Sequence, residues 1–273
     1  MGAEAVGETI AYLGLLDDEQ IELDVAALQL SALDHPGVDL KPYLEALDGY
    51  EAELRAAAGE ARSAIDQARA LARLLAGHHG FTGDSASYDA PLNADMIRVM
   101  DRRRGLPVSL SILYVALARR IGWSTDALNT PGHVLVRVGP GEAAVLIDPF
   151  HGGMPVTERS LLDLLRRSLG EHAEIDGRHL LPMDNRMVLA RLLLNQASRA
   201  ELGNDPARAM ALYGRMVEIA PSNGQGWWDL ARLQLGAGRV EEARGSLSAM
   251  LEVTRDADMR AHISTALEAL AGR

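Results

Sequence analysis

The stretch PGHVLVRVGPGEAAVLIDPF, residues 131–150, contains two apolar runs rich in β-branched residues, separated by the turn sequence GPGE. Runs of this kind joined by glycines predict a β-hairpin, with strands at 133–138 and 143–148. The start of the first strand of a hairpin lies beside the end of the second. His133, which begins the first strand, is therefore expected to lie next to Asp148, which ends the second.

A helix that is apolar on nearly every face precedes the hairpin. The segment VSLSILYVALARRIGW, residues 108–123, directly follows Pro107. Proline fits the first turn of a helix because its missing N–H costs nothing there, and Gly122 is expected to end the helix. A helix of this composition should be buried on most sides. Residues 124–130 are a candidate for one further strand.

Most of the remaining sequence is helical, and three parts are predicted. Residues 1–80 form an N-terminal helical segment that begins with a helix at 23–34. Residues 81–180 form a core with a small antiparallel sheet, and residues 181–273 form helical repeats. The predicted fold class is therefore α+β. The turn-rich sequence 78–95 predicts a long loop, and loops of this length are often functional.

The C-terminal part repeats with a period of 34 residues. The matched pairs are Leu193 and Trp227, Ala197 and Ala231, Ala209 and Ala243, and Tyr213 and Leu247. Small residues at fixed places allow paired helices to pack closely, and the pattern resembles the tetratricopeptide repeat. Pro221 stands where such repeats place a terminating proline, whereas the second copy has Arg255 there. An independent array needs roughly three copies, and this sequence has two. We therefore expect the repeats to pack against the core or against a partner.

Charge and composition exclude several classes of function. The formal net charge is −11, and a nucleic-acid-binding protein needs a basic footprint on which phosphates can bind. The same charge argues against binding to anionic membranes. The sequence MGAEAVGETIAYLGLLDDEQ lacks the basic-then-apolar order of a signal peptide, and no apolar run approaches the roughly 20 residues that span a bilayer. We therefore expect a soluble cytoplasmic protein.

His133 and Asp148 are the residue types of a catalytic pair. A carboxylate beside an imidazole fixes the tautomer of the ring and supports its protonated form. The third member is expected at 105–111, because the N-terminus of a helix favours a developing negative charge. The sequence contains no cysteine, which excludes a thiol nucleophile, a thiolate metal site and disulfides.

Three motifs, RRRGLPVSLSILYVALARRIGW, PGHVLVRV and LIDPFHGG, resemble in this order the core of the transglutaminase-like superfamily. They are most similar to its SirB-type bacterial branch, in which tetratricopeptide repeats often follow the core. The resemblance covers roughly residues 20–260 and implies a papain-like or transglutaminase-like core, with a cysteine at the start of the central helix. By position, His133 and Asp148 match the histidine and aspartate of the triad, and the place of the cysteine falls at Pro107, give or take one residue. Proline carries no nucleophile, so cysteine-dependent transglutaminase or protease chemistry is excluded.

Two other chemistries remain open. Ser109 with His133 and Asp148 would make a thiol-independent hydrolase or acyltransferase. Because Ser111 lies two residues further along the helix, only one of the two serines can face His133; alternatively, Ser109 bonds to backbone amides at the helix start. His133, Asp148 and His151 would make a metal site suited to zinc or Fe(II).

Further candidates concern the binding of a partner. The predicted partner-binding residues are Arg104, Tyr88, Asp89 and Asn93 around the core and Trp228 in the repeats. The run Arg102–Arg104 has two interpretations, a carboxylate or phosphate clamp or a surface paired with Asp101 or Asp89. Trp227 takes a core position of the repeat, which leaves Trp228 for an interface or a ligand groove.

These patterns together favour a cysteine-less, transglutaminase-like protein that has lost ordinary catalysis. It is expected to bind a peptide or protein partner through the core cleft and the repeats. No cofactor is expected, and the sequence leaves the oligomeric state open. The serine-dependent hydrolase and the metalloprotein are the alternatives.

Overall fold

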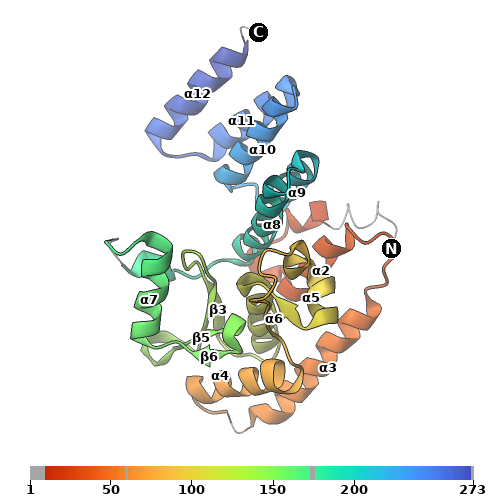
Figure 1. The fold of residues 1–273 in the computed structure, drawn as a ribbon, viewed down its shortest axis with the longest axis vertical. Helices are drawn as coiled ribbons and strands as arrows, with labels where there is room; N and C mark the ends of the chain where they lie inside the picture. Colours follow the sequence, from red (N-terminus) through yellow and green to blue (C-terminus); the bar gives the residue numbers. More distant parts are fainter. Residues whose placement is uncertain (1–9, 60, 173–175, 272–273) are drawn as a thin grey trace. The chain divides into compact units, whose positions relative to one another are not determined.

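The computed structural model describes residues 10–59, 61–172 and 176–271. Residues 1–9 of the predicted N-terminal segment and 272–273 of the predicted repeats lie outside these described residues. The described chain forms two compact units, Asp17–Val188 and residues 189–271 together with 10–16 (Figure 1). The first unit combines helices with a small antiparallel sheet and the second is helical, which confirms the predicted α+β class with C-terminal helical repeats.

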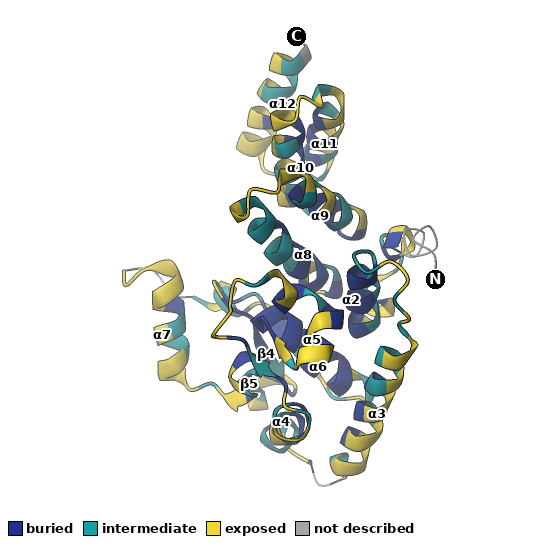
Figure 2. Ribbon diagram, turned by 45° about the vertical axis from the view of Figure 1, so that its right-hand side comes forward, coloured by how far each residue is buried: buried dark blue, intermediate teal, exposed yellow. Residues whose placement is uncertain are grey.

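Helix α6 (Pro107–Arg120) forms the centre of the first unit. Its residues from Pro107 to Ala118 are all buried, as the predicted all-apolar helix requires. The helix packs against α2 (Leu23–Ala32), α3 (Lys41–Ala58) and the sheet. Figure 2 shows buried ribbon concentrated around α6 and the neighbouring strand β4.

Both ends of α6 follow the local sequence. Pro107 occupies the first turn, where the lack of an N–H group leaves no bond unmade. At the other end, the amide of Trp123 donates to the carbonyl of Ala118 at 3.0 Å and that of Gly122 to Arg119 at 3.0 Å. Gly122 has a φ of +85°, so this end is a Schellman motif that requires a residue tolerant of the left-handed region. The predicted end of the helix is confirmed.

A four-stranded antiparallel sheet covers one side of α6. Its strands, in spatial order, are β3 (Thr125–Leu128), β4 (Leu135–Val138), β5 (Val145–Asp148) and β6 (Met154–Pro155). Val138 pairs with Val145 across the predicted hairpin, and the candidate strand within 124–130 is β3. The two-residue strand β6 was not expected from the sequence.

The prediction that His133 begins a strand is wrong. Strand β4 begins at Leu135, two residues later. His133 lies instead at the end of a turn, where its amide donates to the carbonyl of Thr130 at 3.1 Å and Gly132 adopts a φ of +69°. The proline and glycine before His133 favour this turn over an extended strand.

The remaining elements of the first unit are short. They are α4 (Ala64–Ala72), the π-helix η2 (Arg73–His78), α5 (Met96–Arg102), α7 (Glu158–Leu169), the two-residue parallel strands β1 (Thr82–Gly83) and β2 (Arg104–Gly105), and the 3₁₀ turns η1 (Asp18–Gln20), η3 (Pro91–Ala94), η4 (Gly141–Ala143), η5 (Pro149–His151) and η6 (Gly177–Leu180). The predicted helix at 23–34 is confirmed as α2. The predicted loop 78–95 is confirmed in outline, interrupted by β1 and η3.

The second unit contains the predicted helical repeats. Its helices are α8 (Asn185–Leu202), which begins in the first unit, α9 (Pro206–Ile219), α10 (Gly224–Gly236), α11 (Val240–Val253) and α12 (Ala257–Ala271). The small residues of the 34-residue period, Ala197, Ala209, Ala231 and Ala243, are all buried. Gly14 lies against the carbonyl of Glu218 at the end of α9, so the segment 10–16 packs closely on this unit. Among the described residues, no helix combines the length and apolarity needed to cross a bilayer.

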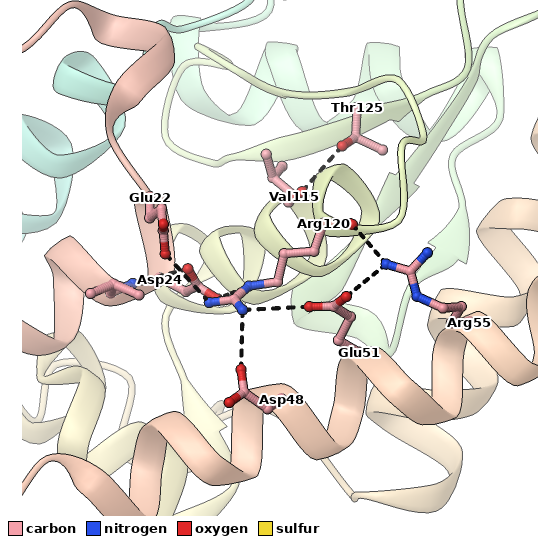
Figure 3. A network of polar contacts seen from close by, with 9 residues as sticks. Glu22, Asp24, Asp48, Glu51, Arg55, Val115, Arg120 and Thr125 are labelled. Atoms are coloured by element: carbon pink, nitrogen blue, oxygen red, sulfur yellow. Dashed lines mark hydrogen bonds and ion pairs between the residues drawn. The ribbon is translucent and has the colours of Figure 1, made fainter.

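Arg120 fixes the C-terminal end of α6 to two other helices (Figure 3). Its Nε donates to Asp24 of α2 at 3.0 Å, and Nη1 lies 3.4 Å from Asp48 and 3.6 Å from Glu51 of α3. Asp24 is only 2% exposed, and a charge buried to that extent needs a partner. Arg55 donates to the backbone carbonyl of Arg120 at 3.2 Å, which joins α3 to α6 a second time.

We predict that Arg120→Met destabilises the first unit by about 3–5 kcal/mol, because it leaves the buried Asp24 carboxylate without its counter-charge. Urea unfolding followed by circular dichroism measures the loss. The matched control is Arg98→Met, which removes an exposed i,i+3 contact with Asp101 of 3.6 Å and should cost less than about 1 kcal/mol. Equal losses in the two variants would contradict the role given to Arg120.

Candidate functional site

His133 and Asp148 meet at the end of the hairpin. The Nε2 atom of His133 lies 2.9 Å from Oδ1 of Asp148. His133 is 8% exposed, so the ring is held in the protein rather than in solvent. A carboxylate in this position orients the ring and selects the tautomer with a proton on Nε2. The sequence therefore placed these two side chains together correctly, although a turn rather than a strand carries the histidine.

A second histidine binds the same carboxylate. Nδ1 of His151 lies 2.7 Å from Oδ2 of Asp148, and the imidazole rings of His133 and His151 are nearly parallel, with centroids 6.3 Å apart. The amides of Phe150 and His151 also donate to Oδ1 of Asp148, at 3.0 and 3.4 Å. Burial disfavours the charge of Asp148, but the hydrogen bonds from the two histidines outweigh it and lower the pKa of Asp148.

Aromatic rings form one wall of the site. The ring of Phe150 lies edge-on to His133 at 6.0 Å and to Tyr88 at 5.7 Å, an arrangement that aromatic pairs prefer. Gly83 allows Phe150 to approach, because a Cβ atom at that position would lie 2.5 Å from the ring. Tyr88 and Asp89 are both exposed. The structure thus places the predicted residue Tyr88 one ring away from His133.

The start of α6 offers no activated hydroxyl among the described residues. Ser109 is fully buried and donates to the backbone carbonyl of Asn93 at 2.7 Å. Ser111 is also fully buried, and its Oγ lies 3.4 Å from the carbonyl of Val134, the residue after His133. The serine that contacts the histidine-bearing segment is therefore Ser111. Each hydroxyl stabilises a loop through a backbone carbonyl.

Asn93 braces the loop beside the site. It is fully buried, and its Nδ2 donates to the carbonyl of Ser87 at 2.6 Å. Arg102 joins the same brace, with Nη1 2.9 Å from Oδ1 of Asn93 and Nη2 2.8 Å from Oδ2 of Asp84. The Arg102 guanidinium and the amide of Ser87 lower the pKa of Asp84. A partner could reach Asn93 only if this loop opened.

The arginine run does not act as one cluster. Arg102 is committed to Asp84, whereas the guanidinium of Arg103 lies 4.7 Å from the ring centre of Phe81 and 5.6 Å from that of Tyr50. Arg104 is exposed on β2. The ion-pair partner of Arg102 that the structure shows is Asp84, at 2.8 Å. The three side chains therefore have three different surroundings, and they do not form one shared anion clamp.

Tyr114 is a residue of the site that the sequence analysis missed. It is fully buried, and its hydroxyl has no hydrogen-bond partner among the described residues. Burial and the negative charge of Asp148 raise the pKa of Tyr114. Gly153 leaves room for this hydroxyl, because a Cβ atom there would lie 2.8 Å from it. The sequence feature that points to Tyr114 is its spacing. It lies seven residues after Pro107, which places both residues on the same face of α6.

A hollow of about 530 Å³ lies between α4 and the turn that leads into β6. Its lining includes Ala72 of α4, Arg73 of η2, and Gly153, Met154 and Pro155. Met154 is 64% exposed. This hollow therefore presents apolar side chains and a basic edge two residues beyond His151.

The two adjacent tryptophans of the second unit have different surroundings. Trp227 packs on the core cluster that includes Ala231, Leu247 and Ile263, and its Nε1 donates to the carbonyl of Pro221 at 2.8 Å. Trp228 is 42% exposed. As predicted, Trp227 of α10 packs in the core of the repeats while Trp228 is exposed.

Comparison with known proteins gives two family matches. The pattern of the transglutaminase-like superfamily matches residues 41–194, and that of the tetratricopeptide repeat matches residues 203–267. Similar chains include a UPF0162 protein of Xylella fastidiosa strain 9a5c, 30% identical over 258 residues that cover 92% of each chain. A UPF0162 protein of Pseudomonas aeruginosa is 29% identical over 211 residues, or 77% of each chain.

Other likenesses cover less of the chain or are weaker. F-box only protein 21 of mouse is 37% identical over 70 residues, which are 26% of this chain and 11% of that protein. The crystal structure of menin, described as revealing the binding site for Mixed Lineage Leukemia protein, superposes with a TM-score of 0.42 and 13% identity, over 92% of this chain and 70% of menin. Neither of these likenesses adds to what the two family matches show.

We predict that Asp84→Asn destabilises the first unit by about 1–2 kcal/mol at pH 7, because the charge-assisted bonds from Arg102 and Ser87 are weakened. The pKa of Asp84 is lowered by folding, so its contribution is present above the unfolded value of about 4 and is lost as pH falls through the folded value. Urea unfolding at pH 7, 5 and 3 should show the difference from wild type shrinking at pH 3. The control is Asp163→Asn on the exposed side of α7; a pH-independent difference for Asp84→Asn would contradict the assignment.

Proposed function

The chain belongs to the transglutaminase-like superfamily, and we propose that it is a pseudo-enzyme that binds a peptide or protein partner. The observation that carries the proposal is a retained His133–Asp148 pair, 2.9 Å apart, in a chain without cysteine. An imidazole and a carboxylate can orient and hydrogen-bond a ligand, but without a thiol or an activated hydroxyl beside them they lack the nucleophile of a triad. The side chains around this pair would then serve the recognition of a partner.

The residues at the helix start support the loss of acyl transfer. Pro107, at the position that the resemblance assigns to the cysteine, has neither a nucleophile nor an N–H group. A serine-dependent reaction would require Ser109 to leave its bond to the carbonyl of Asn93. The same reaction would also require Ser109, which is fully buried, to become accessible to a substrate. We therefore do not favour the hydrolase with Ser109, His133 and Asp148.

Two surfaces are suited to a partner. In the core, Tyr88, Asp89 and Arg104 are accessible near the site or the strands beside it, and the hollow at Met154 offers apolar contact. In the repeats, Trp228, Arg232 and Leu235 are exposed on one face of α10, at the i, i+4 and i+7 spacing that places side chains on one stripe. Tryptophan is among the residues that most often dominate the energy of an interface, whereas Arg232 is already paired with Glu201 at 2.8 Å. The acidic net charge of −11 favours a neutral or basic peptide over an acidic one.

We predict that the purified protein does not hydrolyse activated esters such as p-nitrophenyl acetate faster than His133→Ala does. The reason is that His133 has no side-chain hydroxyl or thiol to activate, and that its own ring is only 8% exposed and so poorly accessible to the ester. The measurement is the release of p-nitrophenolate at pH 7.5, with circular dichroism to show that the variant is folded. A wild-type rate about tenfold above that of His133→Ala would overturn the pseudo-enzyme proposal.

We predict that Trp228→Ala weakens binding of peptides selected from a random 12-residue phage library by about tenfold or more, as expected when a partly exposed aromatic anchor is truncated. Fluorescence polarisation of the labelled peptides measures the dissociation constant. The matched control is Tyr12→Ala, which removes an exposed aromatic ring from the segment 10–16 of the same unit. If no peptide is selected, or if both variants bind as wild type does, the repeat surface is not the binding surface.

A further inference from the structure

We propose that His133, Asp148 and His151 form a binding site for a divalent transition-metal ion of the zinc class. One ligand atom from each of these three side chains lies within 4.8 Å of the other two. The inference concerns the core alone and does not rest on the proposed binding of a partner.

The donor atoms determine which ions fit. Two imidazole nitrogens and one carboxylate oxygen match the preferences of Zn²⁺ and Fe²⁺. Calcium and magnesium instead take oxygen ligands, so two histidines argue against them. Three protein ligands would leave at least one coordination position, which water or a group of a partner would occupy.

The present distances need only a small adjustment. With bonds of about 2.0–2.2 Å around tetrahedral zinc, ligand atoms lie roughly 3.4 Å apart. His133 lies 2.9 Å from Oδ1 of Asp148 and His151 lies 2.7 Å from Oδ2, so these contacts have to lengthen by about 0.5 and 0.7 Å. The ligand atoms of the three side chains lie within 4.8 Å of one another, so the two imidazoles have to approach a shared ion by no more than about 1.4 Å. The side chain of His151 is 67% exposed and is free to make this movement at little steric cost.

The carboxylate is held before an ion arrives. Oδ1 of Asp148 accepts the amide of Phe150 at 3.0 Å, which leaves Oδ2 directed to His151. Outer hydrogen bonds of this kind orient metal ligands and raise affinity. Each imidazole must turn a lone pair to the ion, and a neutral ring can do so by carrying its proton on the other nitrogen.

One other group of side chains has suitable donor atoms among the described residues: Glu53, His78 and His79. Glu53 and His78 are exposed, and the ring of His79 is packed on Tyr50 with centroids 4.2 Å apart. In contrast, His133 is buried and Asp148 is fixed by backbone amides. A long side chain such as Glu53 loses more conformational entropy when it becomes ordered, so we favour the site at Asp148.

The test is isothermal titration of the EDTA-stripped full chain with ZnCl₂ at pH 7.5. Wild type should bind one Zn²⁺ ion at the proposed site, and His151→Ala should weaken that binding by at least about tenfold. Because His151 is exposed, this variant should keep the wild-type circular dichroism. The matched control His78→Ala, which removes a histidine from the other group, should bind as wild type does.

Cobalt provides a second readout of the same site. Co²⁺ bound by two nitrogens and one oxygen in a tetrahedral arrangement should show visible absorption that His133→Ala abolishes. No zinc binding by wild type, equal affinity in His151→Ala, or loss of binding only in His78→Ala would each overturn the proposal.

Discussion

The burial of helix α6 from Pro107 to Ala118 is the constraint on which the first unit depends. A helix apolar on every side has to be enclosed, and it is enclosed here by α2, α3 and the sheet. Its two ends are then the places where polar groups must be satisfied inside the protein. At one end Arg120 meets the carboxylates of α2 and α3. At the other end, Ser109 and Ser111 bond to the carbonyls of Asn93 and Val134, and this second set of bonds holds the loop and the turn that carry the site.

The Asp148 carboxylate has a structural reason to persist without catalysis. It accepts hydrogen bonds from both histidines and from the amides of Phe150 and His151. Replacing Asp148 by an apolar residue would leave two backbone donors without an acceptor, which costs free energy whether or not any substrate is turned over. A retained histidine–aspartate pair is therefore compatible with a protein that has lost its nucleophile. The pair orients a ring and caps the turn η5, and both functions suit a binding site as well as an active site.

Local patterns made the hairpin, the central helix and the repeat predictable, because each depends on residues close in sequence: the GPGE turn, Pro107 with Gly122, and the buried alanines of the 34-residue period. The proximity of His133 and Asp148 followed from the hairpin alone. The other features of the site depend on contacts between residues far apart in the sequence, which local patterns do not predict. That Arg102 pairs with Asp84 across 18 residues, and that Asn93 is buried, depends on how the loop folds back on α5 and α6. The place of Tyr114 beside Asp148 depends on Gly153, a residue whose importance appears only when the sheet and the helix are packed together.

The arginine runs show why sequence charge and surface charge differ in this protein. Arg119 binds the carbonyl of Thr125 and the side chain of Asn185, while Arg120 binds buried Asp24. Arg102 and Arg103 are used in the same way, one on a carboxylate and one on aromatic rings. A guanidinium group suits such internal contacts because it has several N–H donors for carboxylates and carbonyls and a flat face that packs on aromatic rings. Most of the arginines in the runs Arg102–Arg104 and Arg119–Arg120 therefore pair with carboxylates of the same protein or pack on its aromatic rings. Arg102 and Arg103 accordingly stabilise the loops near the site, and Arg104 is exposed to solvent.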